Sequence, residues 1–410
     1  MAPPERRLIA ADWQLLVALL KEVVVTPLGV TALLFFAALL VAEAAVRVLR
    51  IPRITALVVA GVLIGALRRS SEAAALMPLP RVLLEALSMV LLFEVGQRVP
   101  LGWLRRNPWL VAASFGECAV TFAAICAVLA VGFAIPLFDS AFIAVICMTA
   151  SPIVVMSVSK DLRARGQVSE RSLLYCTLSS VYAVLLVQFF LAGYRAAAHV
   201  DITSVVQPVY LLAGSFLLGA LAAAALRLYA LVTRARGPLL TIGIICCCVL
   251  LYAYASPLGL SPILSALFFG LIVRGTDRTH SVLSHQTSEI GAVLTFAYFI
   301  LVGASLPWID SWTLAGVAAA VAVARLLAKT GANAAFAALS ALSPAKGALV
   351  GAACAPLSSL ALSLSASVAQ QPELKHAAEI AAAVVALMAV LGPVFTELAL
   401  RRAGEPTRAA

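Results

Sequence analysis

Apolar residues run along the chain in long blocks that short polar segments separate. A helix needs roughly 20 mostly apolar residues to cross the hydrocarbon core of a bilayer. With this length as the criterion, the pattern predicts an all-α integral membrane protein with about thirteen transmembrane helices. The predicted spans lie near residues 27–47, 54–68, 82–103, 109–134, 139–160, 171–194, 204–232, 238–256, 260–274, 287–309, 312–339, 345–368 and 377–400.

The segment before the first span is apolar but interrupted by charges. LIAADWQLLVALLKEVVV, residues 8–25, carries Asp12, Lys21 and Glu22. We therefore expect residues 1–26 to form an amphipathic helix in the membrane interface, with a fourteenth span as the alternative.

Two predicted spans contain a proline near their middle. Pro152 lies in TASPIVVMSVSKDL, residues 149–162, and Pro356 lies in GAACAPLSSLALSLS, residues 351–365. Proline inside a helix removes a backbone donor and clashes with the preceding turn, at a cost of about 3 kcal/mol or more. The fifth and twelfth spans are therefore predicted to be broken helices.

The two halves of the chain resemble each other. LLFEVGQRVPLGW, residues 91–103, aligns with FILVGASLPWIDSW, residues 299–312, and ALVVAGVLIG, residues 56–65, aligns with SALFFGLIVRG, residues 265–275. Seven spans separate the copies, and because seven is odd, the copies must be oppositely oriented in the membrane. A broken helix at membrane depth needs protein or water to satisfy its free backbone groups, so we expect the two breaks to cross and form a binding site.

This repeat defines the expected organisation of the chain. A single transmembrane unit covers residues 27–400, with a first repeat at about 27–195, a linking helix at about 204–232 and a second repeat at about 238–400. Residues 401–410 form a cytoplasmic tail.

Composition and charge agree with a membrane protein. The chain is 63% hydrophobic and 12% charged, with a mean hydropathy of +1.05. Lysine and arginine gather in the loops after the odd-numbered spans, which places the C-terminus in the cytoplasm and the N-terminus outside a cell inner (plasma) membrane. The net charge of +10 is thus a topology signal, and nothing indicates a nucleic-acid partner.

The eight cysteines all fall inside predicted spans and form no CxxC pair, so we interpret them as small packing residues. No cofactor, metal site or catalytic group is predicted, and an enzyme is not expected.

Six segments along the chain form a recognisable set, namely IPRITALVVAGVLIG, LSMVLLFEVG, TASPIVVMSVSKDL, LSPILSALFFGLIV, YFILVGASL and KGALVGAACAPLSSLALSL. Together they resemble the second family of bacterial monovalent cation/proton antiporters, which includes sodium/proton exchangers and Kef-type potassium efflux transporters. The resemblance implies a thirteen-helix fold whose core domain moves against a dimerisation domain, a homodimer in membrane lipid, and a monovalent cation and a proton as partners.

The chain departs from this resemblance at the expected ion-binding acid. Such antiporters carry Asn-Asp or Asp-Asp midway along the sixth span, where this chain has Ser179 and Ser180. A hydroxyl does not ionise near neutral pH, so it cannot exchange a proton or hold a cation by charge. The twelfth span likewise has Leu357, Ser358 and Ser359 where relatives often carry Arg-Gly-Glu.

Ionisable residues inside spans are functional candidates by default. The resemblance implies that Lys329 pairs with the acid or offsets the ends of the broken helices, and Arg325 is either its neighbour or reaches to the interface. Glu117 lies in the fourth span, the repeat mate of the eleventh, so a Glu117–Lys329 ion pair is expected, either at the site or as a purely structural bridge. Glu94 is expected to pair with Arg98, four residues later.

Three functions remain open. The first is a secondary active transporter that exchanges a cation for protons by alternating access, with Glu117 or Glu94 as the proton-coupling candidate. The second is the same fold with an organic anion or neutral polar solute as substrate, and the third is a membrane scaffold or sensor that transports nothing. The predicted transport and substrate-binding residues are Thr149, Ser151, Pro152, Ser179, Ser180, Lys329, Pro356 and Ser358.

Overall fold

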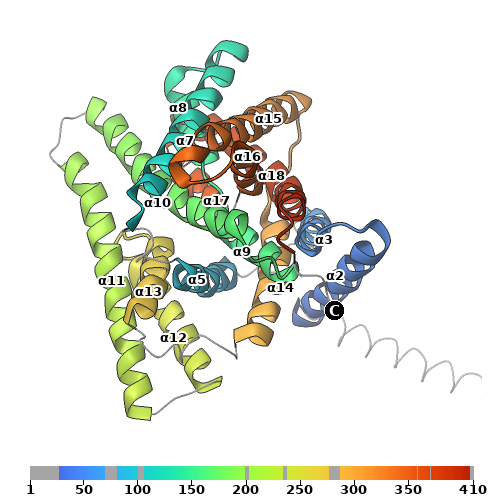
Figure 1. Ribbon diagram of the computed structural model, residues 1–410, viewed down its shortest axis with the longest axis vertical. Helices are drawn as coiled ribbons and strands as arrows, with labels where there is room; N and C mark the ends of the chain where they lie inside the picture. The colour runs from blue at the N-terminus through green and yellow to red at the C-terminus, as the bar shows by residue number, and fades with distance from the viewer. Residues whose placement is uncertain are drawn as a thin grey trace, which may run out of the picture. The chain divides into compact units, whose positions relative to one another are not determined.

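The protein is described by a computed structural model, in which every described element is a helix (Figure 1). The expected interfacial helix at residues 1–26, Ser358 and the last four residues of the tail lie outside the described residues. The structure describes residues 27–69, 81–99, 106–198, 203–233, 238–276, 287–357, 359–369 and 371–406.

Each of the predicted spans coincides with a helix, or with a pair of short helices in the fifth and twelfth spans. The single helices are α2 (Pro27–Leu49), α3 (Arg53–Leu67), α5 (Arg81–Arg98), α7 (Pro108–Ala127), α10 (Gln167–Ala198), α11 (Thr203–Thr233), α12 (Pro238–Ala255), α13 (Pro262–Thr276), α14 (Thr287–Ser305), α15 (Trp312–Ala335) and α18 (Lys375–Arg402). The paired helices are α8 (Leu137–Cys147) with α9 (Pro152–Asp161) and α16 (Pro344–Ala353) with α17 (Ser359–Val368). Short elements are the π-helix η1 (Val128–Gly132) and the 3-10 helices η2 (Ala337–Ser340) and η3 (Pro372–Leu374).

Seven helical segments of the described chain are long and apolar enough to cross a membrane, and four shorter helices are also apolar. Large apolar side chains point outward along these helices, for example Phe36 on α2, which is 60% exposed, and Leu231 on α11, which is 71% exposed. Exposed apolar surface of this extent is a liability in water, so it is suited to contact with lipid.

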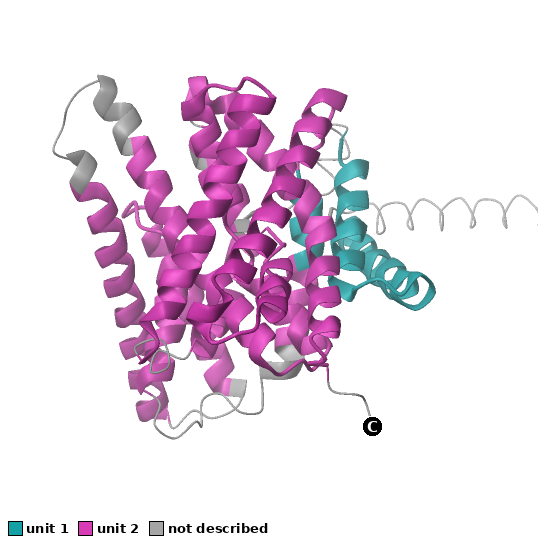
Figure 2. Cartoon of the chain, turned by 45° about the horizontal axis from the view of Figure 1, so that its top comes forward, with its two compact units in different colours: residues 1–81, 299–306 teal, residues 82–298, 307–410 magenta. Residues whose placement is uncertain are grey.

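The chain divides into two compact units (Figure 2). The first contains residues 1–81 and 299–306, and in it α3 crosses the end of α14 at very close range. A Cβ atom on Gly61 would lie 2.9 Å from the Gly303 Cα, so only glycine allows this approach. The second unit contains the rest of the chain, and there Gly96 of α5 meets Gly270 of α13 in the same way. Each crossing joins helices from different halves of the sequence, at glycines that the two halves share.

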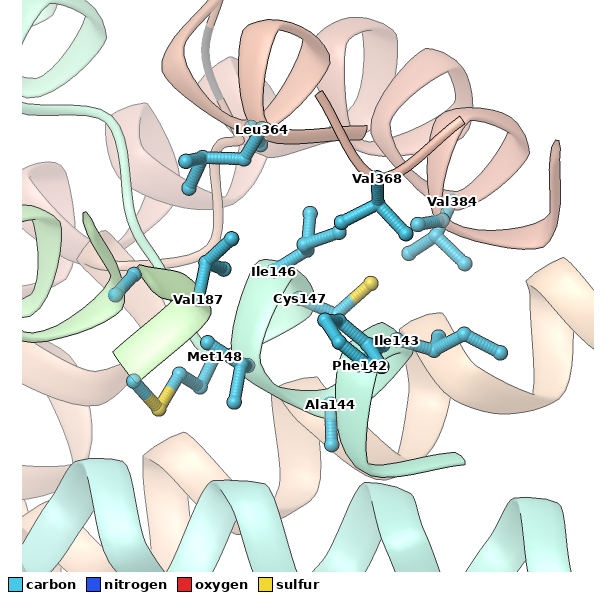
Figure 3. Close-up of a cluster of buried hydrophobic side chains, with 14 of the residues drawn as sticks. Phe142, Ile143, Ala144, Ile146, Cys147, Met148, Val187, Leu364, Val368 and Val384 are labelled. Atoms are coloured by element: carbon cyan, nitrogen blue, oxygen red, sulfur yellow. The ribbon is translucent and has the colours of Figure 1, made fainter. Parts of the chain in front are cut away.

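The second unit is built around the fifth and twelfth spans. Helices α7, α10, α16 and α18 contact one another or α15, and α11, α12 and α13 form a neighbouring group (Figure 1). Helix α8 is buried from Ser140 to Cys147, and its side chains join those of α10, α17 and α18 in one hydrophobic cluster (Figure 3). A helix that is apolar all round belongs in an interior, so this packing holds the breaks in fixed positions.

Candidate functional site

Both predicted breaks are present in the structure. Helix α8 ends at Cys147 and α9 begins at Pro152, where a missing N–H does no harm because first-turn N–H groups have no partner within the helix. Ser151 caps α9, and its side chain accepts a hydrogen bond from the Val154 N–H at 3.3 Å. In the twelfth span, Pro356 lies within the break between α16 and α17.

The two breaks touch each other. The Ser151 N–H donates to the Pro356 carbonyl oxygen at 2.8 Å. Ser151, Pro152 and Pro356 are all buried, so this backbone hydrogen bond forms within the protein interior. The predicted crossing of the broken helices is therefore observed.

Arg325 of α15 binds the carbonyl ends of both broken helices. Its Nε donates to the Cys147 carbonyl at 2.6 Å and its Nη2 to the Cys354 carbonyl at 3.1 Å. Its Nη atoms also donate to the carbonyls of Thr149 and Ala355. The last carbonyls of a helix lack partners and carry partial negative charge, so one fully buried guanidinium satisfies and neutralises both ends.

This contact corrects the expected role of Arg325. The residue does not reach to the membrane interface, since its side chain is 0% exposed, and it makes the contacts that the resemblance implied for Lys329. Arg325 and Lys329 lie four residues apart and so share one face of the helix. That spacing indicates from the sequence that both side chains point toward the same region, but it does not indicate which of the two reaches the breaks.

Lys329 instead pairs with Glu117 of α7. Its Nζ lies 2.6 Å from the Glu117 Oε1, and each side chain is 1% exposed. The carboxylate also accepts hydrogen bonds from the Thr121 hydroxyl at 3.2 Å and the Cys118 thiol at 3.6 Å. The expected ion pair is therefore present. Its Lys329 lies one helical turn from Arg325, which binds both breaks.

The two serines in place of the acids bind backbone groups. The Ser179 hydroxyl accepts from the Ala150 N–H at 3.2 Å and donates to the Cys176 carbonyl at 2.9 Å. The Ser180 hydroxyl donates to the same carbonyl at 2.9 Å. Both are buried, so these serines connect α10 to the first break without adding charge.

Of the remaining predicted residues, Thr149 lies at the breaks and Glu94 does not. Thr149 lies in the first break, where its hydroxyl donates to the Ile146 carbonyl at 2.8 Å. Glu94 lies elsewhere, since it pairs with Arg98 at 3.2 Å and with Lys160 at 2.5 Å. Lys160 is in the last turn of α9 and Pro152 in its first, so about 12 Å of helix separates Glu94's partner from the breaks.

Three of the cysteines lie next to residues of the candidate site. The Sγ atoms of Cys176 and Cys354 are 3.6 Å apart across α10 and the second break, and Cys118 contacts Glu117. All eight cysteines are free, and the described residues contain no group of three or more side chains that could hold a metal ion. Sequence reasoning missed this clustering because cysteine positions alone do not show which helices adjoin.

Comparisons with known proteins agree with this architecture. A search among curated proteins finds no match. The structure is similar to that of the sodium proton antiporter MjNhaP1 from Methanocaldococcus jannaschii at pH 8, with a TM-score of 0.68 and 15% identity over 92% of this chain and 98% of that one. It is also similar to MjNhaP1 as determined by electron microscopy, with a TM-score of 0.68 and 16% identity over 93% of this chain and 99% of that one.

A family model assigns the chain directly. The model for the transmembrane region of sodium/hydrogen exchangers matches residues 30–401, nearly the whole chain. Members of this family are transporters and not enzymes, and the crossed broken helices are in keeping with that assignment. The protein therefore belongs to the sodium/hydrogen exchanger family and is a multi-pass membrane transporter of the cation/proton antiport type.

Proposed function

We propose that the Glu117–Lys329 pair is the group at which this antiporter exchanges a monovalent cation for a proton. The observation that supports this proposal is the buried contact of 2.6 Å between the two side chains. A carboxylate must bind the cation by charge, and Ser179 and Ser180 cannot do so. Among the predicted proton-coupling residues, Glu117 pairs with Lys329, which lies one helical turn from the residue that binds both breaks, whereas Glu94 is engaged at the far end of α9.

The charge balance of the pair sets the stoichiometry. In the proton-loaded state, the Glu117 carboxylate is neutralised by the Lys329 ammonium. A cation that binds the carboxylate displaces the ammonium, which then releases a proton because an unpaired buried charge is strongly unfavourable. The pair plus its cargo has the same charge in both states, so the exchange is one cation for one proton and electroneutral.

Glu117→Gln in proteoliposomes with an internal pH-sensitive dye tests this proposal. The wild-type protein is expected to alkalinise the lumen when sodium, lithium or potassium is added outside, because each cation that enters moves one proton out. Glu117→Gln is expected to abolish the response. Lys329→Met is expected to do the same, since no ammonium remains to release the proton.

The double variant Glu117→Gln/Lys329→Met separates exchange from helix packing. Removing one partner of a buried ion pair is expected to cost about 3–5 kcal/mol, and removing both costs less because no uncompensated charge remains. We expect the double variant to regain most of the thermal unfolding midpoint but no exchange. Recovery of exchange together with stability would show that the pair only fixes α7 against α15 and would refute the proposal.

The fixed charges around the Glu117–Lys329 pair favour organic anions as a second candidate substrate class. Two buried cations, Arg325 and Lys329, stand against the one carboxylate of Glu117, which leaves a positive balance. An organic anion would suit that balance. If no alkali cation drives proton movement, stabilisation of the purified protein by a panel of small organic acids supports this alternative.

The number of spans and the bounds of the repeats are also proposals. We propose thirteen spans in one transmembrane unit over residues 27–400, with repeats at about 27–195 and 238–400, a linking helix at about 204–232, and an interfacial helix before residue 27. The two glycine crossings at Gly61–Gly303 and Gly96–Gly270 support the inverted repeat, because equivalent residues of the two halves make them.

The cellular setting is also a proposal. Lysine and arginine in the loops after odd-numbered spans support an inner (plasma) membrane protein with its N-terminus outside and its C-terminus in the cytoplasm. The segments quoted above support kinship with the Kef-type exchangers and, through that kinship, a homodimer in lipid.

A further inference from the structure

Thr121 of α7 uses its hydroxyl differently from two other buried threonines of the protein. The hydroxyls of Thr177 and Thr295 donate to the backbone carbonyl four residues earlier, at 2.8 and 2.6 Å, as threonine commonly does inside a helix. Thr121 also lies four residues after its partner, Glu117, but its hydroxyl donates to the side-chain Oε1 at 3.2 Å. The helix therefore offers this hydroxyl two acceptors, and the structure shows it on the carboxylate.

The Thr121 hydroxyl and the Lys329 ammonium bind the same carboxylate oxygen. The Lys329 Nζ lies 2.6 Å from the Glu117 Oε1, which also accepts from the hydroxyl. The other oxygen, Oε2, accepts from the Cys118 thiol at 3.6 Å, and a thiol is a soft ligand that suits an alkali cation poorly. Of the described side chains that hydrogen-bond to this carboxylate, Thr121 is thus the one with a neutral oxygen.

A cation at this carboxylate needs a neutral oxygen because the surroundings are dry. Thr121, Glu117 and Lys329 are all buried. A cation that leaves water loses its hydration shell, and a single carboxylate does not replace all the oxygens that are lost. A neighbouring hydroxyl can supply another, because its hydrogen rotates to suit its partners and its oxygen carries two lone pairs.

The serines that replace the usual acids are less suited to this role. Each of their hydroxyls already donates to the Cys176 carbonyl, and Ser179 also accepts from the Ala150 N–H. Binding a cation there would require breaking the contacts that attach α10 to the first break. Thr121 attaches no second helix, so its hydroxyl can turn without that loss.

We propose that Thr121 is a ligand of the transported cation and helps to decide which alkali cation binds. When the cation takes the place of the Lys329 ammonium at Oε1, the Thr121 hydroxyl hydrogen turns from the carboxylate to the Glu117 backbone carbonyl, four residues earlier. The hydroxyl oxygen then presents a lone pair to the cation. The inference rests on the proposed exchange at Glu117 and adds a specificity-determining residue to it.

Thr121→Val and Thr121→Ser in proteoliposomes test this assignment. Valine keeps the shape of the side chain and removes the hydroxyl, whereas serine keeps the hydroxyl. For each of sodium, lithium and potassium that the wild type exchanges, Thr121→Val is expected to raise the KM about tenfold, as loss of one contact to a charged group predicts. The increase should be larger for a smaller cation, because the smaller ion interacts more strongly with a dipole. Thr121→Ser should keep a KM close to that of the wild type.

Thermal unfolding in detergent measures cation binding without transport. The wild-type midpoint is expected to rise when the chloride salt of the cation is added. Thr121→Val should lose most of that rise, and Thr121→Ser should keep it. Thr295→Val on α14 is the matched control, since it removes a buried hydroxyl that donates to a backbone carbonyl. It should keep both the wild-type KM and the rise.

Two results would overturn the inference. One is a lower maximal rate of Thr121→Val at an unchanged KM for every cation, which would show that the hydroxyl only holds the Glu117 side chain in position. The other is an undiminished rise of its midpoint with added cation. Thr121→Ala also lacks the hydroxyl and gives the same measurements if the valine variant does not fold.

The Glu117→Gln variant separates this inference from the proposed function. If Thr121→Val fails to change the KM while Glu117→Gln abolishes exchange, the proposed function stands and the cation takes its neutral oxygen elsewhere. An active Glu117→Gln protein would instead refute the proposed function itself.

Discussion

At the residue scale, Arg325 is the clearest case of a side chain whose chemistry the fold requires. Four carbonyl groups at two helix ends converge on it in a buried region. Arginine is suited to this position because its planar group presents five donors in a fixed fork and cannot be deprotonated in a protein. Lysine has three donors at a single point and cannot reach the same set of carbonyls.

Arg325→Lys is therefore expected to destabilise the protein even though the charge is kept. Leaving at least one or two buried carbonyls without partners costs roughly 2–4 kcal/mol. The thermal unfolding midpoint in detergent should fall by several degrees, and exchange should fall with it because the breaks lose their fixed positions. Lys346→Arg, at an exposed position on α16, is the control and should leave the midpoint unchanged. An equal midpoint for Arg325→Lys would contradict the role assigned to the guanidinium.

At the scale of elements, the start of α10 is held by a residue from the opposite end of the chain. The Glu405 carboxylate accepts from the Val168 N–H at 2.6 Å and from the Ser169 N–H at 2.9 Å. A carboxylate satisfies the free N–H groups of a helix start and interacts favourably with the helix dipole. Gly166 permits this contact, since a Cβ atom there would overlap the carboxylate.

Glu405→Ala is expected to lower stability by about 1 kcal/mol, the usual value of a lost helix cap. The same change should make the C-terminal residues easier to cleave with protease, because the tail loses its attachment to α10. Glu43→Ala is the control, as its ion pairs with Arg47 and Arg53 are exposed and contribute little. Equal midpoints and cleavage rates for the Glu405 variant and the wild type would show that the contact is incidental.

At the scale of the whole molecule, the two halves follow one plan in opposite orientations. Gly61 approaches Gly303 and Gly96 approaches Gly270, so each half supplies one partner to each crossing. Each half also supplies one broken helix, and the two breaks are joined by a direct backbone hydrogen bond. The proposed odd number of spans between the copies would give the two members of each pair opposite directions in the membrane.

The orientation can be tested with reporter fusions. A fluorescent protein after Ala410 should be bright and alkaline phosphatase at the same point inactive, because the C-terminus is expected in the cytoplasm. Fusions after Arg69, which follows an even-numbered span, should show the reverse. Identical reporter behaviour at both points would require a different number of spans between them, and reversed behaviour at both would place the N-terminus inside.

The sequence by itself determined the helical spans, the two breaks and the inverted repeat. Hydrophobic length and proline chemistry are local properties, so they act in the same way wherever the segment lies. The Glu117–Lys329 pair was also predictable, because repeat-related spans that both carry a buried charge must neutralise it. Only the tertiary structure decided that Arg325 rather than Lys329 binds the breaks, that Glu94 belongs to the far end of α9, and that Glu405 caps α10. These outcomes depend on which side chains meet across separate helices, and helical spacing alone does not specify such contacts.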